Sequence, residues 1–383
     1  MNEDVAILGG GIVGLLMAIR ALEYGRRPIV LERGAIGRGA SCASLNVVHG
    51  GLRSLQSLDL QGWRRARRAQ GWWARHHPRH VRPLVCTMPL YTRSLRSRTA
   101  MRAAFALDRA LTQLEPGSIA LEGRLRSRAE VLDRWDVAAA GLTGAAEWRE
   151  WSIADPTALM QELADTIRAQ GGSMREGVDT CAITRHNGRM AAVQLADGDV
   201  VEATAMLLCA GSAGQTLARR IDPGVQVPSS CTLGWNVLFD RSMPTDTLAA
   251  NKMLAVSPVA GRGRSLFLRE EGGRTLAGTG YAACEAGDRP VQPAAADLDL
   301  FCSDVIKAYP ALADAAILEV RAGQLPDNGT PGTLRQADLL IDHGACGGTP
   351  GVLTLSATKL STAPLLASDA ASWLWGRPLK DQT

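Results

Sequence analysis

The chain lacks paired cysteines and long apolar segments. None of its eight cysteines belongs to a C-x-x-C pair, so we expect neither a metal site nor a disulfide framework, but scattered thiols in a reducing cytoplasm. The apolar stretch between Val5 and Ile19 is interrupted by glycines and is shorter than the ~20 residues that a transmembrane helix needs. The chain begins with acidic rather than basic residues, which argues against a signal peptide. Its 383 residues predict a cytoplasmic globular protein of two or three domains.

Lysine is scarce, with four residues against 38 arginines. Thirteen of the arginines lie in residues 52–109, where only Asp59 and Asp108 offset them, so this segment carries a charge of +11 and the rest of the chain −7. Such a block is typical of a surface that binds nucleic acid, anionic lipid or an anionic substrate, or of a solvated helix face. We favour the helix face, because arginine enrichment is general in this chain and no aromatic-interleaved motif for nucleic acid accompanies the block.

Residues 55–73 repeat apolar side chains at helical spacing, with most of the arginines elsewhere on the helix. The pattern indicates core packing, and an interfacial helix at the inner face of a membrane is the less favoured alternative. Trp135, Trp148 and Trp151 flank a run of small residues at 138–146. These tryptophans either wall a substrate pocket or belong to the core.

The first 33 residues carry the strongest local signal. A G-x-G-x-x-G motif at 9–14 lies between an apolar run at 5–8 and a helical pattern that ends near Gly25. A second apolar run at 28–31 ends at Glu32. The order of strand, glycines, helix, strand and acid is typical of a dinucleotide site.

Each part of this motif has a physical role. Gly9 permits the sharp turn from strand to helix, Gly11 lets the backbone approach a pyrophosphate, and Gly14 lets the helix pack on the strand. The helix N-terminus directs its free N–H groups at the phosphates. Glu32 follows Gly14 by 18 residues, near the ~20 expected for an acid that binds ribose hydroxyls. Because its carboxylate would repel the extra phosphate of NADP, the motif predicts FAD or NAD.

Later segments identify the cofactor more closely. A loop of small residues at 34–53 ends in H-G-G-L-R, residues 205–214 combine a strand with an A-G turn, and residues 353–362 combine a strand with K-L-S-T. In these segments the sequence resembles FAD-dependent oxidoreductases of the D-amino-acid oxidase superfamily. Its H-G-G-L-R segment is similar to that of the flavin-dependent glycerol-3-phosphate dehydrogenases. The loop at 34–53 and the K-L-S-T segment favour FAD over a nicotinamide dehydrogenase without flavin. A flavoprotein that binds nucleic acid is a third alternative, which no aromatic-interleaved motif supports.

The resemblance implies an α/β fold with a discontinuous, Rossmann-like FAD-binding domain of the glutathione-reductase type. We place this domain at residues 1–80, 150–215 and 335–383. Residues 81–149 and 216–334 would then form an α+β substrate-binding domain on a mixed or antiparallel sheet.

The resemblance also implies which residues bind FAD. They come from the glycine motif, the end of the second strand, the loop after it and the later segments: Gly9, Gly11, Ile12, Val13, Gly14, Glu32, Arg33, Arg38, Ser41, Cys42, Ala43, Ser44, Val178, Ala210, Gly211, Thr358, Lys359 and Leu360. Backbone N–H groups of Thr358 and Leu360 are expected to face a flavin carbonyl. Cys42 lies near the expected path of the flavin, and nothing in the sequence indicates a covalent link.

Four residues are candidates for the reaction itself. His49 is our candidate base, because an imidazole titrates near neutral pH, and a structural hydrogen bond is the alternative. Arg53 and Arg335 are expected to clamp a carboxylate or phosphate, unless they bind backbone carbonyls or the pyrophosphate. Lys359 would stabilise reduced anionic flavin or charge that develops on the substrate, unless it is a solvated residue at a helix start.

Two departures from the family pattern concern the substrate. The family's two glycines before the lysine are Ala357 and Thr358 here, and its phosphate-binding arginine in G-x-R-P-L corresponds roughly to Gln324. We expect hydride transfer to flavin N5 from the CH–OH carbon of a small anionic substrate, with oxidation of an amine or amino acid as the alternative. Oxygen or a quinone is the expected electron acceptor.

Overall fold

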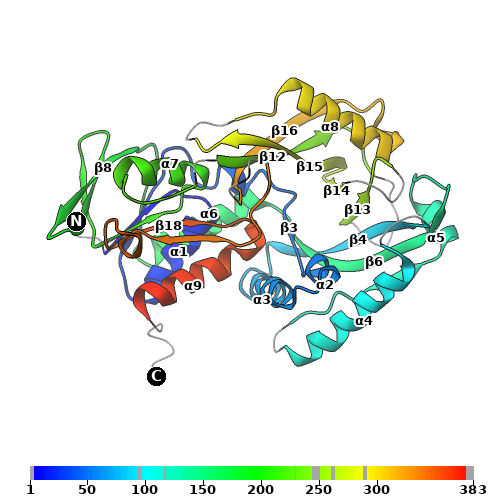
Figure 1. Cartoon of the computed structure of the whole chain (residues 1–383), viewed down its shortest axis with the longest axis horizontal. Helices are drawn as coiled ribbons and strands as arrows, with labels where there is room; N and C mark the ends of the chain where they lie inside the picture. Colours follow the sequence, from blue (N-terminus) through cyan, green and yellow to red (C-terminus); the bar gives the residue numbers. More distant parts are fainter. Residues whose placement is uncertain are drawn as a thin grey trace.

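Two large sheets lie side by side in the computed structural model (Figure 1). The structure describes residues 4–92, 96–115, 118–228, 230–243, 251–259, 264–287, 291–328, 330 and 332–376. The first large sheet has six strands in the order β17-β18-β11-β1-β2-β7, all parallel to their neighbours except β17. Their bounds are β1 Val5–Leu8, β2 Pro28–Leu31, β7 Ser173–Arg175, β11 Ala205–Leu208, β17 Leu339–Asp342 and β18 Val352–Ser356.

Alternate residues of these strands pack on opposite faces of the sheet, as the two-residue period of a strand requires. Val5 and Ile7 of β1 pack against α1 (Ile12–Glu23), α6 (Pro156–Ala169) and α9 (Ala363–Trp375). Ala6 and Leu8 pack against a three-stranded sheet and helix α7. The bounds on this second face are β8 Thr180–His186, β9 Arg189–Leu195, β10 Val200–Glu202 and α7 Ser212–Ile221. Both faces are therefore covered, which explains the uninterrupted apolar runs at β1 and β2.

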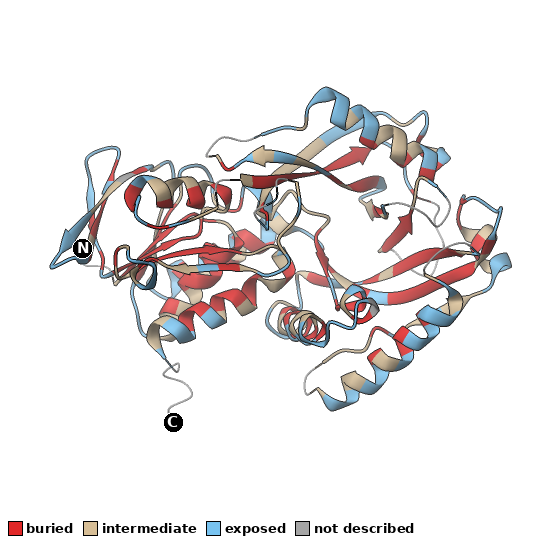
Figure 2. Cartoon of the chain, viewed as in Figure 1, coloured by how far each residue is buried: buried red, intermediate tan, exposed pale blue. Residues whose placement is uncertain are grey.

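The second large sheet has nine strands in the order β16-β12-β15-β14-β13-β4-β6-β3, with β5 also paired to β6. The bounds are β3 Val47–Val48, β4 Val81–Tyr91, β5 Arg124–Arg126, β6 Leu142–Ile153, β12 Ser230–Phe239, β13 Lys252–Val256, β14 Leu266–Glu271, β15 Arg274–Glu285 and β16 Ile317–Pro326. Helices α2 (Leu52–Gln56) and α4 (Arg98–Leu114) pack on one face, and α5 (Arg128–Arg134) and α8 (Ala295–Ala308) on the other. Figure 2 shows buried strands in both large sheets and exposed outer sides on α4 and α8. The sheet contains both parallel and antiparallel pairs, in agreement with the mixed sheet expected for substrate binding.

The predicted domain ranges can be compared with the strands. All six strands of the parallel sheet fall within the ranges predicted for the FAD-binding domain. β3 also falls within those ranges, yet it pairs with β6 of the nine-stranded sheet, and β6 continues past residue 150. The exact domain boundaries remain a prediction.

The helix expected at 55–73 is two helices, α2 and α3 (Leu60–His76). The break lies at Leu58, which has a positive φ of 57° and an exposed fraction of 76%. The spacing predicts Leu58 on the apolar side of one continuous helix, and this prediction is wrong. Asp59 then caps α3 by accepting a hydrogen bond from the N–H of Gly62 at 2.8 Å. Trp63 and Trp73 of α3 are buried, so this part of the stripe is core.

Several arginines of the basic block have acidic partners. Arg67 is fully buried and pairs with Asp108, and Arg64 and Arg68 pair with Glu115. Trp135 and Trp148 are also core residues, packed on opposite faces of the nine-stranded sheet. Among the described residues, no helix is long and apolar enough to cross a bilayer, and no cluster of three or more His, Cys, Asp or Glu side chains suits a metal ion.

Candidate functional site

The turn between β1 and α1 requires glycine at two positions. Gly9 has a φ of +109°, and a Cβ there would lie 2.7 Å from the Cα of Ala210. A Cβ on Gly14 would lie 1.9 Å from the carbonyl oxygen of Gly9. Because β1 and β11 are parallel neighbours, the turns after both strands meet at one edge of the sheet, where Gly211 precedes α7 with a φ of +58°. Ligands of open α/β sheets bind at such an edge.

Glu32 lies at the same edge, directly after β2. Its carboxylate accepts hydrogen bonds from the N–H groups of Gly10 and Gly34, both at 2.7 Å. The N–H of Val178 donates to the backbone carbonyl of Glu32 at 3.1 Å. Since a carboxylate has about four acceptor sites, Glu32 retains acceptor capacity for ribose hydroxyls.

Ser41 lies at the N-terminus of α1. Its Oγ accepts a hydrogen bond from the N–H of Ile12 at 3.0 Å, and a Cβ on Gly11 would also lie 3.0 Å from it. The N-terminus of α1 therefore brings backbone N–H groups and the Ser41 hydroxyl together, and both kinds of group can donate hydrogen bonds to a pyrophosphate. We call Gly9, Gly11, Gly14, Glu32 and Ser41 the cradle.

Other predicted cofactor residues line the loop that follows. Arg33 and Arg38 are exposed. The Cys42 thiol donates to the carbonyl of Gly37 at 2.8 Å, and burial raises its pKa. Cys42 is therefore a protonated thiol at neutral pH, which is a poor nucleophile.

Side chains of the nine-stranded sheet form hydrogen bonds with the backbone of the same loop. Asn236 of β12 donates to the carbonyl of Ala43 at 2.6 Å, and Arg269 of β14 donates to the carbonyl of Leu45 at 2.6 Å. Ser44 hydrogen-bonds Asn46 within the loop. Sequence reasoning missed Asn236 and Arg269, although a polar residue inside an apolar strand is a usable signal, because a buried polar group needs a partner.

His49 follows β3 in the loop. Its neighbours Val48 and Gly50 are buried, whereas its own side chain is exposed. Even so, desolvation by the surrounding protein, followed by the charges of Lys359 and Arg53, lowers the pKa of His49 to about 3. At neutral pH the imidazole of His49 is therefore uncharged.

Arg53 and Lys359 act on His49, and Arg53 in turn acts on Arg96. Burial and then the charge of Arg53 lower the pKa values of Lys359 and of Arg96, which lies between β4 and α4. Arg96 also donates to the hydroxyl of Ser265, beside β14. No carboxylate among the described residues forms an ion pair with Arg53. We call His49, Arg53, Arg96 and Lys359 the cationic cluster. Sequence reasoning missed Arg96, which is one arginine among many in the basic block.

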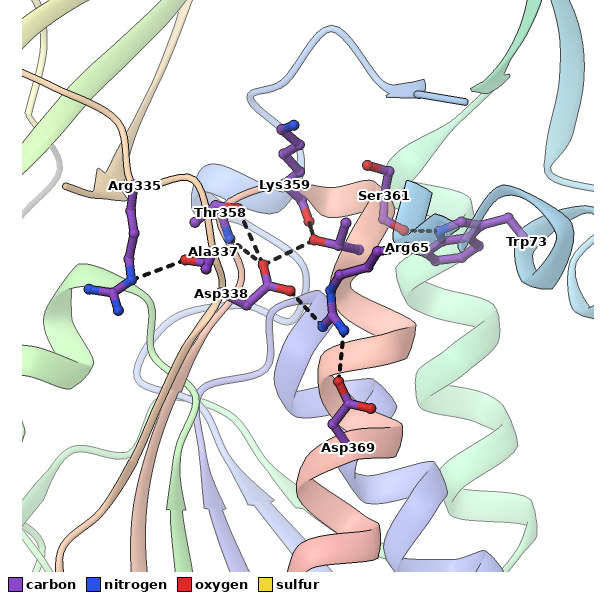
Figure 3. Close-up of polar contacts among 10 residues, drawn as sticks. Arg65, Trp73, Arg335, Ala337, Asp338, Thr358, Lys359, Ser361 and Asp369 are labelled. Carbon is purple, nitrogen blue, oxygen red and sulfur yellow. Dashed lines mark hydrogen bonds and ion pairs between the residues drawn. The ribbon is translucent and has the colours of Figure 1, made fainter. Parts of the chain in front are cut away.

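A hydrogen-bonded turn presents Lys359 to this cluster. Oδ1 of Asp338 accepts from the N–H and hydroxyl of Thr358, at 3.0 and 3.2 Å, and from the hydroxyl of Thr362 at 3.0 Å. Figure 3 shows the Lys359 side chain extending away from Asp338. Leu360 packs beneath the turn against the core. The turn therefore fixes the backbone at Thr358 and Leu360, the two predicted flavin contacts.

Helix α3 supports the turn from behind. Arg65 donates to Asp338 at 3.0 Å and to Asp369 at 2.8 Å, and the indole N–H of Trp73 donates to the carbonyl of Ser361 at 3.0 Å (Figure 3). Part of the basic block thus acts as a scaffold for the Lys359 turn.

Arg335 does not join the cluster. Its Nε donates to the carbonyl of Ala337 at 3.1 Å, and its guanidinium points away from Lys359 (Figure 3). Gln324 is also engaged elsewhere: it accepts from the hydroxyl of Ser212 at 2.6 Å and donates to the carbonyl of Glu285 at 3.1 Å. Of the four predicted reaction residues, the structure brings together His49, Arg53 and Lys359.

A buried acid behind His49 was also missed by sequence reasoning. Glu150 of β6 is 3% exposed and accepts a hydrogen bond from the N–H of Gly50 at 2.5 Å. Burial raises the pKa of Glu150 to about 7. Its position between Arg149 and Trp151 gives no local signal, because its contacts with Gly50 and Gln70 span 100 and 80 positions of the chain.

Comparison with known proteins agrees with an FAD-binding fold. Residues 4–372 match the family model described as DAO, FAD dependent oxidoreductase. Glycerol-3-phosphate dehydrogenase 1 of Mycobacterium bovis is 26% identical over 96% of this chain and 71% of its own length. Glycine oxidase of Pseudomonas putida is 26% identical over 85% of this chain and 83% of its own length.

A solved structure shows the same fold. Glycerol-3-phosphate dehydrogenase from Bacillus halodurans, complexed with FAD, superimposes with a TM-score of 0.68 at 16% identity, over 97% of this chain and 64% of that one. This chain therefore spans about two thirds of that protein. The close glycine turn, the fixed Glu32 carboxylate and the α1 N-terminus fit the ribose and pyrophosphate of FAD. The chain belongs to the DAO family of FAD-dependent oxidoreductases.

Proposed function

We propose that this enzyme oxidises a small anionic substrate at a CH–OH carbon, in the manner of a glycerol-3-phosphate dehydrogenase. The observation that supports this most is the cationic cluster, in which Arg53 and Lys359 both act on a neutral His49. Clustered positive charge favours an anion and disfavours a cationic amine. The 26% identity to glycerol-3-phosphate dehydrogenase 1 agrees with this choice.

The reaction assigns one role to each residue. FAD, when bound, supplies the hydride acceptor at its N5. Arg53 and Lys359 hold the anionic group and so orient the CH–OH carbon. The neutral imidazole of His49 accepts the hydroxyl proton as the C–H bond gives up its hydride, so the alcohol loses one proton and one hydride and becomes a carbonyl.

Binding of an anionic substrate is also expected to raise the pKa of His49. In the free enzyme two cations oppose protonation of the imidazole. An anion bound between them offsets this repulsion and raises the basicity of His49 when a base is needed. An uncharged alcohol lacks that effect and is expected to be a poor substrate.

Oxidation of an amino acid is the second candidate. Glycine oxidase of Pseudomonas putida matches this chain over 83% of its own length, and Gln324 stands roughly where the family's phosphate-binding arginine is expected. A zwitterionic amino acid would still present its carboxylate to Arg53. Oxygen or a quinone is the proposed electron acceptor in either case.

Anaerobic titration of the FAD-loaded protein tests the proposal. We expect sn-glycerol 3-phosphate or another anionic alcohol to bleach the oxidised flavin band, and glycerol to leave it unchanged. Glycine and a panel of L-amino acids serve as the competing set. Bleaching by the amino acids alone would replace the proposal with its alternative. Mixing the reduced protein with oxygen or with a soluble quinone then identifies the acceptor.

A further inference from the structure

Two buried hydrogen bonds hold the backbone on either side of His49. Gln70 of α3 donates to the carbonyl of Val48 at 3.1 Å, and the N–H of Gly50 donates to Oε2 of Glu150 at 2.5 Å. Gln70 and Glu150 are 1% and 3% exposed. A Cβ on Gly50 would lie 2.7 Å from Nη1 of Arg67, so a buried side chain of α3 packs closely against this backbone. These two contacts therefore fix the backbone at both neighbours of His49.

Glu150 holds this arrangement best as a carboxylate, which is an acceptor only. Oε2 also accepts from Gln70 at 3.1 Å, and Oε1 accepts from the indole N–H of Trp148 at 3.1 Å. All three contacts are donors. A proton on either oxygen adds an O–H donor for which these contacts offer no acceptor and makes that oxygen a weaker acceptor, so the hydrogen bonds to the carboxyl group lose strength.

We propose that Glu150 is a positioning residue that sets the orientation of His49 through Gly50, and that protonation of Glu150 loosens this orientation. The proposal rests on the proposed role of His49 as the base. The hydrogen bonds of Glu150 join it to Gly50, Gln70 and Trp148, so it acts on His49 through the backbone of that segment.

The surroundings of Glu150 place its titration in the neutral range. Burial raises its pKa to about 7, against the charge of Arg67 on α3, which lowers it. Arg67 is itself paired with Asp108 of α4. Cys86 of β4 also faces Glu150, and burial holds its thiol protonated. His49, in the loop, stays neutral to about pH 3 and adds no charge in this range. Glu150 is thus the group of this set that changes charge between pH 6 and 8.

Glu147 provides a matched control. It lies on the same strand, is 7% exposed, and points to the opposite face because the two residues are an odd number of positions apart. It pairs with Arg124 and Arg126 of β5 instead of the His49 segment. Glu147→Gln therefore removes a buried carboxylate from β6 without altering the contacts of Gly50.

The test follows the His49 imidazole by NMR in the FAD-loaded full chain labelled with 13C at histidine Cε1, with His49→Asn to assign the signal. In the native protein and in Glu147→Gln we expect the His49 signal to shift with a midpoint near pH 7. In Glu150→Gln that midpoint disappears. A midpoint that persists in Glu150→Gln, or is absent from the native protein, overturns the proposal.

A second variant keeps the test decisive if Glu150→Gln does not fold. Gln70→Met removes one donor to the carboxylate, which destabilises the charged form, so the midpoint should move to higher pH. An unchanged midpoint counts against the proposal. Because this readout needs no substrate, a protein that shows the midpoint but is reduced by no anionic alcohol contradicts the proposed function alone.

Discussion

The cradle and the cationic cluster are built in different ways. The cradle comes from residues 9–41, a short stretch in which backbone geometry and close contacts do most of the work. The cationic cluster joins His49, Arg53, Arg96 and Lys359, and its members depend on buried partners elsewhere in the chain. The cradle therefore depends mainly on neighbouring residues in the sequence, whereas the cationic cluster depends on contacts between distant parts of the chain. We therefore expect substitutions in the cradle to reduce FAD binding, and substitutions at or behind the cationic cluster to impair the reaction with FAD still bound.

The largest effect is expected in the cradle. In Gly14→Ala the new Cβ would lie 1.9 Å from a backbone oxygen that cannot rotate away, so α1 must shift off β1. Overpacking of this kind costs about 1–3 kcal/mol or more, and we expect the purified protein to lose its FAD. The ratio of flavin to protein absorbance measures this.

Gly224→Ala is the control for that experiment, since nothing lies within 4 Å of the added Cβ and the backbone there is ordinary. It should keep full flavin content. A Gly14→Ala protein that retains stoichiometric FAD would show that the helix–strand contact is not what holds the cradle together.

An intermediate effect is expected behind Lys359. Asp338→Asn keeps an oxygen for the threonine donors but turns an NH2 group toward Arg65. Loss of such a charged hydrogen bond corresponds to roughly a tenfold fall in kcat/KM, with FAD still bound. Asp338 also raises the pKa of Lys359, so its loss should shift the alkaline decline in rate to lower pH. Stopped-flow flavin reduction across pH measures both effects.

Asp369→Asn is the matched control, because Asp369 shares Arg65 but touches no part of the Lys359 turn. We expect its rate to stay within about twofold of the native protein. Equal losses in the two variants would mean that Arg65, and not the turn, carries the effect.

The difference between the two regions also explains what the sequence could predict. Strands at 5–8 and 28–31 and the helix after Gly9 follow from local spacing, and the structure reproduces them. The role of Glu32 toward ribose also follows from spacing and stays a prediction. The family resemblance supplied FAD, His49 and Lys359. Glu150 and Asp338 were missed, because they act through hydrogen bonds to residues 100 and 20 positions away in the chain. No local pattern records such contacts.

The smallest effect is expected at Arg335, which the sequence proposed as a partner of Arg53 in the substrate clamp. Its guanidinium bonds a neighbouring carbonyl and points away from Lys359. Arg335→Ala should therefore change KM by less than about twofold, whereas Arg53→Ala removes a charge that acts on both His49 and Lys359 and should raise KM by roughly 10- to 100-fold. Steady-state kinetics with the substrate that bleaches the flavin compares the two variants. A large KM effect at Arg335 would mean that the loop carrying it moves toward the cationic cluster when substrate binds, because its contact with Ala337 is local and easily exchanged.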